Sequence, residues 1–365
     1  MIDCAEIGVF YPVESSTFFD WYFKNTYPPL AATVGTYNEL DAFVTSTHLK
    51  KIVCLQVHNV FHPEHDELIQ QVYDHADSIL ICCSEIHAST IDFVRRNDRQ
   101  KIAFFFCGFL NFELEHATYF PTLDWFAPTV KFYKETRPET LDALRPYDTK
   151  PLYYDALLGR KKLHRECAKN CLKMFMPDQG ILTYFEDQDS SFKDDTAANW
   201  IWESAGLELT HDVKWTADTV RYYGHEIRLS SIIPIEIYNQ TAYTLIPETS
   251  HDSGHVLLSE KVVKPILARR LFVLTGCKYS LQKLKDIGFL TFDSIIDESY
   301  DTLEDPLART RAAVQQLKYL CTMPQQQVFD QCKPILEHNF NHMISTDWYS
   351  EYFKRPFNNF FGINR

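Results

Sequence analysis

Basic side chains are concentrated in the stretch Gly159-Arg-Lys-Lys-Leu-His-Arg165, which stands at the expected start of a helix. Its candidate ligand-binding residues are Arg160, Lys162, His164 and Arg165. A helix N-terminus carries unpaired N–H groups and partial positive charge, so cations gathered there are unfavourable unless an anion is bound. Arginine can hold two phosphate oxygens at once, and lysine adds a point charge. The stretch predicts a phosphate site, and the alternative is a solvated basic face.

A second candidate site begins at Glu248, where an expected strand ends. Ser259, Glu260 and Lys261 follow at the expected start of the next helix. A carboxylate at a strand end can accept two ribose hydroxyls or orient a cation, and Lys261 can reach a diphosphate. Further cations extend the positive field: Lys264, Arg269 and Arg270. In the alternative interpretation, Glu260 and Lys264 are only a surface pair four residues apart on a helix.

The stretch Asp297-Glu-Ser-Tyr-Asp301 places acids around a single aromatic residue, Tyr300, which we also count as a candidate donor-binding residue. These acids could hold the basic loops in place, or could form a turn and a helix N-cap. The histidines His58, His62 and His65 suggest a metal, but their surroundings offer no ligand face. We therefore expect no metal site, no metal requirement and no tightly bound cofactor.

These stretches follow the strands of an expected parallel sheet in the second half of the chain. The expected strands are 152–158, 242–246, 271–275 and 289–292, and the expected helices are 161–175, 257–269, 279–287 and 305–320. Ligands of open parallel sheets bind beyond the carboxyl ends of the strands. Four loops should therefore meet there: 159–165, 248–261, 276–279 and 293–301.

The first half also alternates strands with helices. Its expected strands are 51–57, 78–83 and 101–106, and its expected helices are 66–75 and 88–96. This alternation favours parallel βαβ units, and three prolines in 137–151 suggest a boundary. We predict an α/β protein of two Rossmann-like lobes, with domains at 1–150 and 151–335. An aromatic-rich segment, 336–365, should pack back on the body.

Composition excludes several classes of protein. The 365 residues have a net charge of −13, and residues 1–150 hold 12 Lys and Arg against 21 Asp and Glu, which argues against nonspecific coating of nucleic acid. The ten cysteines lack Cys-x-x-Cys spacing, which favours reduced thiols. No signal peptide or membrane-length apolar run is visible, so we expect a cytoplasmic protein that does not contact membranes.

The stretch YTLIPETSHDSGHVLLSEK resembles the donor-binding motif of the α1,3-fucosyltransferases. In that motif, a strand ends in Glu-Asn and a Thr/Ser-Glu-Lys opens the next helix. The chain resembles more closely a glycosyltransferase family of phages and marine viruses, through three elements in the same order, at 157–165, 259–266 and 288–301. The resemblance as a whole covers about 170 residues. Thr249 replaces the fucosyltransferase Asn, so the sugar nucleotide stays open.

The resemblance implies the GT-B architecture, in which a C-terminal lobe binds a nucleotide-sugar and an N-terminal lobe faces the acceptor. Glu248, Glu260 and Lys261 would hold the donor, with Arg160 and Arg165 near its diphosphate. The reaction would transfer a hexose or pentose to a hydroxyl group. The general base should come from the N-terminal lobe, where Glu85 and Glu14 are candidates.

The acceptor and the class of function have alternatives. For a viral protein, which would act in the host cytoplasm, we favour hydroxymethylated cytosine in DNA, and a surface glycan or lipopolysaccharide is the alternative acceptor. A noncatalytic nucleotide-binding protein on the same scaffold and a zinc-dependent nucleic-acid enzyme are alternatives of other classes. The oligomeric state is open.

Overall fold

The computed structural model describes residues 7–10, 35–37, 40–45, 50–57, 63–83, 88–185, 214–215, 219–222, 225–228, 231–251 and 254–361. The chain divides into two compact units, each described below by itself. Unit 1 consists of Met1–Leu123 and Trp348–Arg365, and unit 2 of Asp124–Asp347. This division places 124–150 with the second half of the chain and 348–365 with the first.

Unit 1 contains a parallel sheet in the order β2-β1-β3-β4-β5-β7. Its strands are β1 (Ile7–Phe10), β2 (Gly35–Tyr37), β3 (Lys50–Val57), β4 (Ser78–Cys83), β5 (Ile102–Cys107) and β7 (Thr118–Thr122), with the short β6 at Phe109–Leu110. Its first helices are α3 (Leu40–Thr45), α4 (Pro63–Tyr73) and α5 (Ala88–Arg96). Every residue of β5 is buried, as expected for a parallel strand covered on both faces.

The two faces of β5 are covered by different parts of the chain. Phe104 lies 6.5 Å, between ring centroids, from Phe93 of α5. Phe105, on the opposite face, lies 5.9 Å from Phe353 and 6.0 Å from Phe357. These two rings belong to the C-terminal segment, a π-helical turn (Ser350–Lys354) followed by α15 (Arg355–Phe361). The aromatic residues at the end of the chain therefore complete the core of unit 1.

Unit 2 contains a parallel sheet in the order β15-β13-β8-β9. Its strands are β8 (Leu152–Arg160), β9 (Gly180–Phe185), β13 (Thr241–Pro247) and β15 (Phe272–Thr275), with β14 at His255–Val256. A separate antiparallel sheet consists of β10 (Lys214–Trp215), β11 (Thr219–Tyr222) and β12 (His225–Arg228). All seven residues of β13, the central strand next to β8, are buried.

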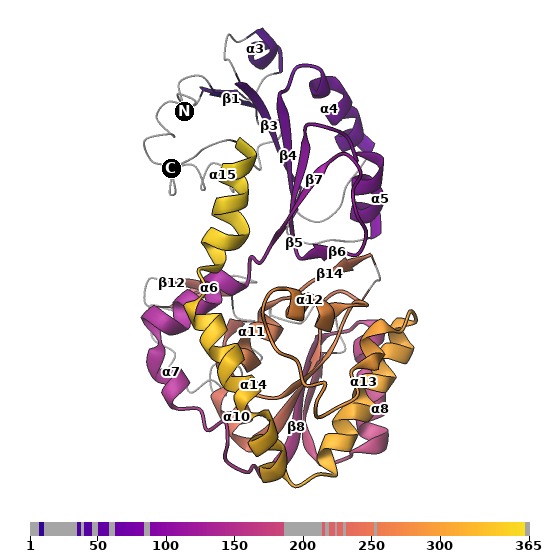
Figure 1. Ribbon diagram of the computed structural model, residues 1–365, viewed down its shortest axis with the longest axis vertical. Coiled ribbons are helices and arrows are strands. Elements are labelled where there is room, and N and C mark those ends of the chain that lie inside the picture. Colours follow the sequence, from indigo (N-terminus) through magenta and orange to yellow (C-terminus); the bar gives the residue numbers. More distant parts are fainter. Residues whose placement is uncertain are drawn as a thin grey trace. The chain divides into compact units, whose positions relative to one another are not determined.

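Helices cover both faces of this sheet. In Figure 1, α8 (Leu163–Phe175) and α13 (Pro306–Cys321) lie on one side of β8, while α10 (Ile235–Gln240), α11 (Glu260–Leu267) and α14 (Gln325–Ser345) lie on the other. The other helices among the described residues of unit 2 are α6 (Phe126–Lys131), a π-helical turn (Phe132–Thr136), α7 (Pro138–Asp142), α12 (Ser280–Asp286) and a 3-10 turn (Ser299–Thr302). Unit 2 is therefore a three-layered α/β unit with its loops at the strand ends.

The sequence predicted most of these elements, and the expected strand at 289–292 was wrong. The side-chain amide of Asn339 satisfies both the N–H and the carbonyl of Leu290, at 2.8 Å each. The N–H of Phe292 donates to Glu298 at 2.7 Å. Because side chains satisfy these backbone groups, the segment needs no partner strand. Gly288, at φ 95°, follows α12 as the sequence predicted for a helix end.

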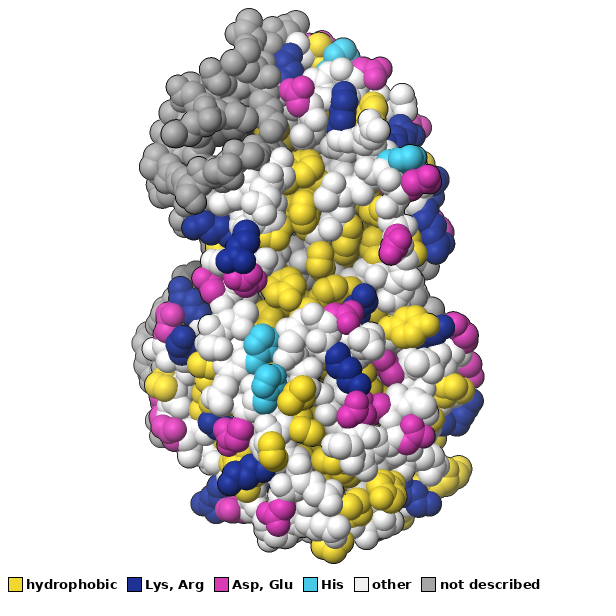
Figure 2. Space-filling view, viewed as in Figure 1, with side chains coloured by type: hydrophobic (Ala, Val, Ile, Leu, Met, Phe, Trp, Pro, Cys, Tyr) yellow, Lys and Arg dark blue, Asp and Glu magenta, His cyan; other side chains and the backbone are white. Residues whose placement is uncertain are grey.

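Charged side chains of both signs are interspersed over the face of unit 2 drawn in Figure 2. On unit 1, Lys and Arg side chains lie along the margin formed by α4 and α5 (Figure 2). The cations at the end of α5 are Arg95, Arg96, Arg99 and Lys101. Among the residues that the structure describes, no helix is long and apolar enough to cross a membrane.

Candidate functional site

Three of the four loops expected to meet do follow neighbouring strands of the unit 2 sheet. Strands β8, β13 and β15 end at Arg160, Pro247 and Thr275, and β13 lies between the other two. The fourth loop, 293–301, does not follow a strand, but the main-chain carbonyl of its Asp301 accepts from Tyr279 N–H at 3.0 Å. The four stretches therefore meet around the carboxyl end of β13.

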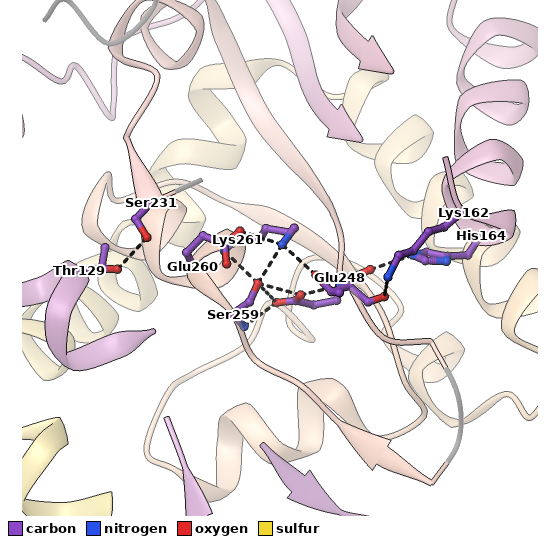
Figure 3. A network of polar contacts seen from close by, with 9 residues as sticks. Thr129, Lys162, His164, Ser231, Glu248, Ser259, Glu260 and Lys261 are labelled. Carbon is purple, nitrogen blue, oxygen red and sulfur yellow. Dashed lines mark hydrogen bonds and ion pairs between the residues drawn. The ribbon is translucent and has the colours of Figure 1, made fainter. Parts of the chain in front are cut away.

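Glu248 lies at the centre of this edge, fully buried, and its carboxylate faces the protein. One oxygen, Oε1, accepts from the Ser259 N–H at 2.7 Å and from Ser259 Oγ at 2.9 Å. The other, Oε2, accepts from the Thr249 N–H at 2.8 Å (Figure 3). Ser259 is also the N-cap of α11, since its Oγ accepts from the Lys261 N–H at 3.3 Å. Glu248 thus ties the end of β13 to the start of α11.

Lys261 lies directly beside this carboxylate. Its Nζ donates to Thr249 Oγ1 at 3.0 Å, to Ser259 Oγ at 3.2 Å and to Glu260 Oε1 at 2.8 Å. The Lys261 side chain is 23% exposed, while that of Glu260 is 3% exposed. The ammonium group is therefore held in one place, while the side chain as a whole stays partly exposed.

Lys162 approaches the same place from the loop after β8. Its Nζ donates to the main-chain carbonyl of Thr249 at 2.9 Å. Lys162 and Lys261 come from segments about a hundred residues apart in the chain, and both donate to Thr249. The two basic stretches identified in the sequence therefore share one site.

His164 supports this site as a neutral side chain. It is fully buried, and its Nε2–H donates to the main-chain carbonyl of Glu248 at 2.8 Å. Its ring stacks on His251, with 4.3 Å between ring centroids. Burial, followed by the nearby His251 and Arg165, lowers the pKa of His164 to about 3. We expected a cation here, but at neutral pH the imidazole is uncharged and fixes the loop after β13.

The irregular end of β8 depends on Gly159, which has a φ of 64°. A side chain at this position would be strained, and its Cβ would lie 3.4 Å from Nη1 of Arg165. Arg165 is buried, with 5% of its surface exposed, in the first turn of α8. Arg160 ends β8, and its place in the chain puts it at the same edge of the sheet.

Glu260 is buried and Lys264 is half-buried, so they are not a solvated surface pair. Burial opposes ionisation of Glu260, yet the ammonium groups of Lys261 and Lys264 lower the pKa of its carboxyl. Burial lowers the pKa of Lys264 to about 8, while Glu260 acts in the opposite direction. Opposite charges at low dielectric favour each other's charged forms. The start of α11 is therefore a coupled cluster of charges.

The acidic stretch supplies structural caps. Asp301 Oδ2 accepts from the N–H groups of Leu281, at 3.0 Å, and Gln282, at 3.4 Å, in the first turn of α12. Burial raises the pKa of Asp301 to about 6. Tyr300 is 2% exposed, and burial raises the pKa of its hydroxyl well above its usual range. The alternative interpretation of this stretch as a turn and helix cap is confirmed for Asp301.

Arg269 and Arg270 do not extend the positive field as expected. Arg270 Nη2 forms a buried ion pair with Asp155 Oδ2, on β8, at 2.6 Å. The pair lies next to Thr241, the first residue of β13. Arg269 pairs with Glu337 at 3.2 Å and stacks on Phe340. Both arginines point away from the carboxyl end of β13, because their partners lie elsewhere.

Sequence reasoning missed Arg309, on α13, which is fully buried. Its guanidinium donates to the carbonyls of His251, at 2.9 Å, and Gly276, at 2.8 Å, and also to that of Leu303. No motif includes it, and a lone arginine within an amphipathic helix gives no signal for such contacts. It therefore becomes visible only in three dimensions.

Two further predictions concern the reaction and a metal. The candidate general bases, Glu85 and Glu14, lie outside the described residues, as do His58 and His62 of the histidine run. Within the part of the chain that the structure describes, no three His, Cys, Asp or Glu side chains are grouped so that they could hold a metal ion.

Comparison with known proteins gave few matches. No protein-family model matches the sequence, and no curated protein matches it. Among solved structures, the chain is similar to "Crystal Structure of alpha1,3-Fucosyltransferase", with 10% identity, 93% of this chain and 91% of that chain covered, and a TM-score of 0.34. At this TM-score the likeness carries no argument about function. The fold and site define an α/β protein with parallel sheets and clustered charges at the carboxyl edge of the second.

Proposed function

We propose that the protein is a glycosyltransferase and that unit 2 binds the diphosphate of a nucleotide-sugar donor at the carboxyl end of β13. One observation carries this proposal: Lys162 and Lys261, from different loops, both donate to Thr249. The motifs at 157–165, 259–266 and 288–301 support it from the sequence.

The charges around Thr249 favour an anion. Lys162, Arg165, Lys261 and Lys264 provide four cations, and Glu248 and Glu260 provide two carboxylates. Bringing like charges together in a partly desolvated place is unfavourable, and a bound diphosphate relieves the repulsion. An oxygen of the diphosphate can replace Thr249 as the acceptor from each ammonium group.

The residues take different roles in this proposal. Lys162 and Lys261, with Arg160 and Arg165, contact the diphosphate. Glu248, whose two oxygens are used by Ser259 and the Thr249 N–H, positions the loop. The sequence suggested a direct contact between Glu248 and the donor, and its burial instead favours this indirect role. Glu260 and Lys264 set the charge and position of Lys261, and the buried Tyr300 takes a structural role.

The transfer needs two things from the protein. The bond between the anomeric carbon and the diphosphate breaks, and the departing oxygen takes the electron pair, which Lys162 and Lys261 stabilise. The acceptor oxygen bonds to the anomeric carbon and gives its proton to a base. We propose that Glu85 or Glu14 accepts this proton. The cationic side chains take the part that a metal has in other transferases, so we propose that no metal is required.

The donor-site proposal is tested with Lys261→Ala and Lys162→Ala. Each variant should weaken binding of GDP or UDP, whichever the wild type binds, at least about tenfold, which corresponds to about 1.4 kcal/mol. Lys283→Ala is a matched control, because the Lys283 side chain is 27% exposed and pairs with Asp286 on α12. If neither nucleotide binds, or if the control weakens binding equally, the donor site is not here.

Product analysis distinguishes catalysis from nucleotide binding alone. Wild-type protein mixed with a panel of nucleotide-sugars and acceptors should release nucleoside diphosphate and give a glycosylated product, and Lys261→Ala should lose both. Binding without donor hydrolysis or transfer would favour the noncatalytic alternative.

For the acceptor, we propose hydroxymethylated cytosine in DNA, as the viral resemblance implies. Cations at the end of α5 offer phosphate contacts, since the Arg95 and Arg96 side chains are 59% and 55% exposed. Transfer should occur to DNA containing hydroxymethylcytosine and not to the same DNA containing cytosine. Transfer to oligosaccharides alone would identify a glycan transferase instead.

A further inference from the structure

We propose that Arg309 is a positioning residue for the diphosphate site, a role that rests on the proposed function. Arg309 holds together the loops that follow β13 and β15, and through them fixes the place at which Lys162 and Lys261 meet. The role follows from which groups its guanidinium contacts and from what those groups contact in turn.

The guanidinium of Arg309 joins three separate segments. Nη2 donates to the His251 carbonyl at 2.9 Å, and Nε donates to the Gly276 carbonyl at 2.8 Å. Nη1 donates to the carbonyl of Leu303, before α13. A planar guanidinium has five N–H donors in fixed directions, which lysine cannot reproduce. Arginine is therefore suited to hold three carbonyls at set spacing.

Both of the loops held by Arg309 are linked to Glu248. His251, whose carbonyl Arg309 holds, stacks on His164, which donates to the Glu248 carbonyl. Gly276, the other anchor, packs so closely that a Cβ there would lie 3.1 Å from Glu248 Cβ. Cys277 Sγ also donates to Ser250 Oγ at 3.4 Å. A shift of either loop would therefore move Thr249, the residue that both lysines contact.

Arg309 differs from Arg270, another buried arginine of this unit. Arg270 forms an ion pair with Asp155, whereas Arg309 donates hydrogen bonds to main-chain carbonyls among the described residues. Burial lowers the pKa of Arg309, while acidic groups including Asp301 oppose this effect. Burying a guanidinium whose hydrogen bonds go to neutral carbonyls is costly, and this supports a role beyond packing.

The test compares Arg309→Lys with Arg270→Lys, two substitutions that keep the charge and remove the planar fork. Binding of inorganic pyrophosphate to the full chain is measured by calorimetry at a temperature where circular dichroism shows each variant folded. Arg309→Lys should raise the Kd at least about tenfold, which is 1.4 kcal/mol, and Arg270→Lys less than about threefold. An unchanged Kd for Arg309→Lys, or an equal loss in both variants, would overturn the proposal.

Amide hydrogen exchange gives a readout that does not depend on the ligand. The amides of 249–251 should exchange faster in Arg309→Lys than in the wild type, and at the wild-type rate in Arg270→Lys. Equal exchange in Arg309→Lys and the wild type would contradict the positioning role. If the wild type binds no pyrophosphate, the proposed donor site fails, while exchange still decides whether Arg309 holds the loop.

A second variant covers the case in which Arg309→Lys does not fold. Gly276→Ala keeps Arg309 and places a methyl group 3.1 Å from Glu248 Cβ and 3.2 Å from Ser280 Oγ. It should separate the same two loops and raise the pyrophosphate Kd about threefold or more. A folded Gly276→Ala protein with wild-type affinity would show that loop spacing does not control the site.

Discussion

The two ends of β13 carry two polar centres built from similar residues. At its beginning, the closed centre consists of Asp155, Thr241, Thr244 and Arg270, and at its end, the open centre consists of Glu248, Thr249, Ser259, Lys162 and Lys261. Each centre combines a buried carboxylate with cations and hydroxyls. They differ in where the cations point and in how much of them is exposed.

In the closed centre, groups of the protein accept the hydrogen bonds of the cation. The Arg270 guanidinium donates to Asp155, to the hydroxyls of Thr241 and Thr244 and to the carbonyls of Tyr238 and Thr241. In the open centre, the carboxylate of Glu248 accepts from Ser259 and the Thr249 N–H, and the two lysines donate to Thr249 instead. The Lys261 side chain stays 23% exposed. The partner of the carboxylate therefore decides whether nearby cations are available to a ligand.

The largest effect is expected in the closed centre. Asp155→Asn removes the buried partner of Arg270 and leaves a buried cation without its counter-ion, which should lower the free energy of unfolding by about 3–5 kcal/mol. Urea unfolding measures this loss. The folded fraction should bind pyrophosphate with wild-type affinity. A tenfold change in that affinity would show that the two centres are coupled.

The next effect is the pH dependence of His164, which is buried and neutral in the open centre. Its pKa is about 3 in the folded protein and 6.5 when exposed, so the unfolded chain binds the extra proton first as pH falls. Stability should therefore fall between about pH 6.5 and pH 3, by roughly 3 kcal/mol by pH 4. Thermal unfolding of His164→Gln, compared with the wild type, should show a weaker dependence. Parallel curves would contradict this assignment.

A smaller loss is expected for Glu248→Gln. The new amide must place N–H donors against the Thr249 N–H or the Ser259 groups, which leaves buried donors unsatisfied and should cost about 1–3 kcal/mol. Chemical unfolding measures the stability, and calorimetry measures pyrophosphate binding, which should weaken as well. Unlike Asp155→Asn, this variant should affect both, and an effect on stability alone would make Glu248 purely structural.

The smallest effect on stability is expected for Lys162→Ala. Its ammonium donates to one carbonyl at a half-buried position, so its loss should change the free energy of unfolding by less than about 1 kcal/mol. Pyrophosphate binding should weaken strongly all the same, and the affinity of the wild type should fall with added salt. A stability loss as large as that of Asp155→Asn would show that Lys162 has a structural role like that of Arg270.

The sequence predicted the open centre better than the closed one. Gly159, Lys162, Glu248 and Lys261 stand out because glycine, cations and a carboxylate follow apolar strands, and the carboxyl ends of parallel strands share one edge. In the sequence, Arg270 looks like the cations of the open centre. Its role is different, because it pairs with Asp155, 115 residues away. Pairing over such a separation leaves no local pattern.

Two other features of unit 2 could not be predicted for the same reason. The segment at 289–292 has the composition of a strand, but Asn339, 49 residues later, satisfies its backbone. His164 has the type of a phosphate ligand, but burial against His251 makes it neutral. In each case a contact made only in the folded chain decides the state of the residue.

The most direct test of the open centre is calorimetric titration of the full chain with inorganic pyrophosphate. The wild type should show saturable binding, the double variant Lys162→Ala/Lys261→Ala should lose it, and Lys283→Ala should retain it. Equal binding by the wild type and the double variant, or none by either, would contradict a diphosphate site at the carboxyl end of β13.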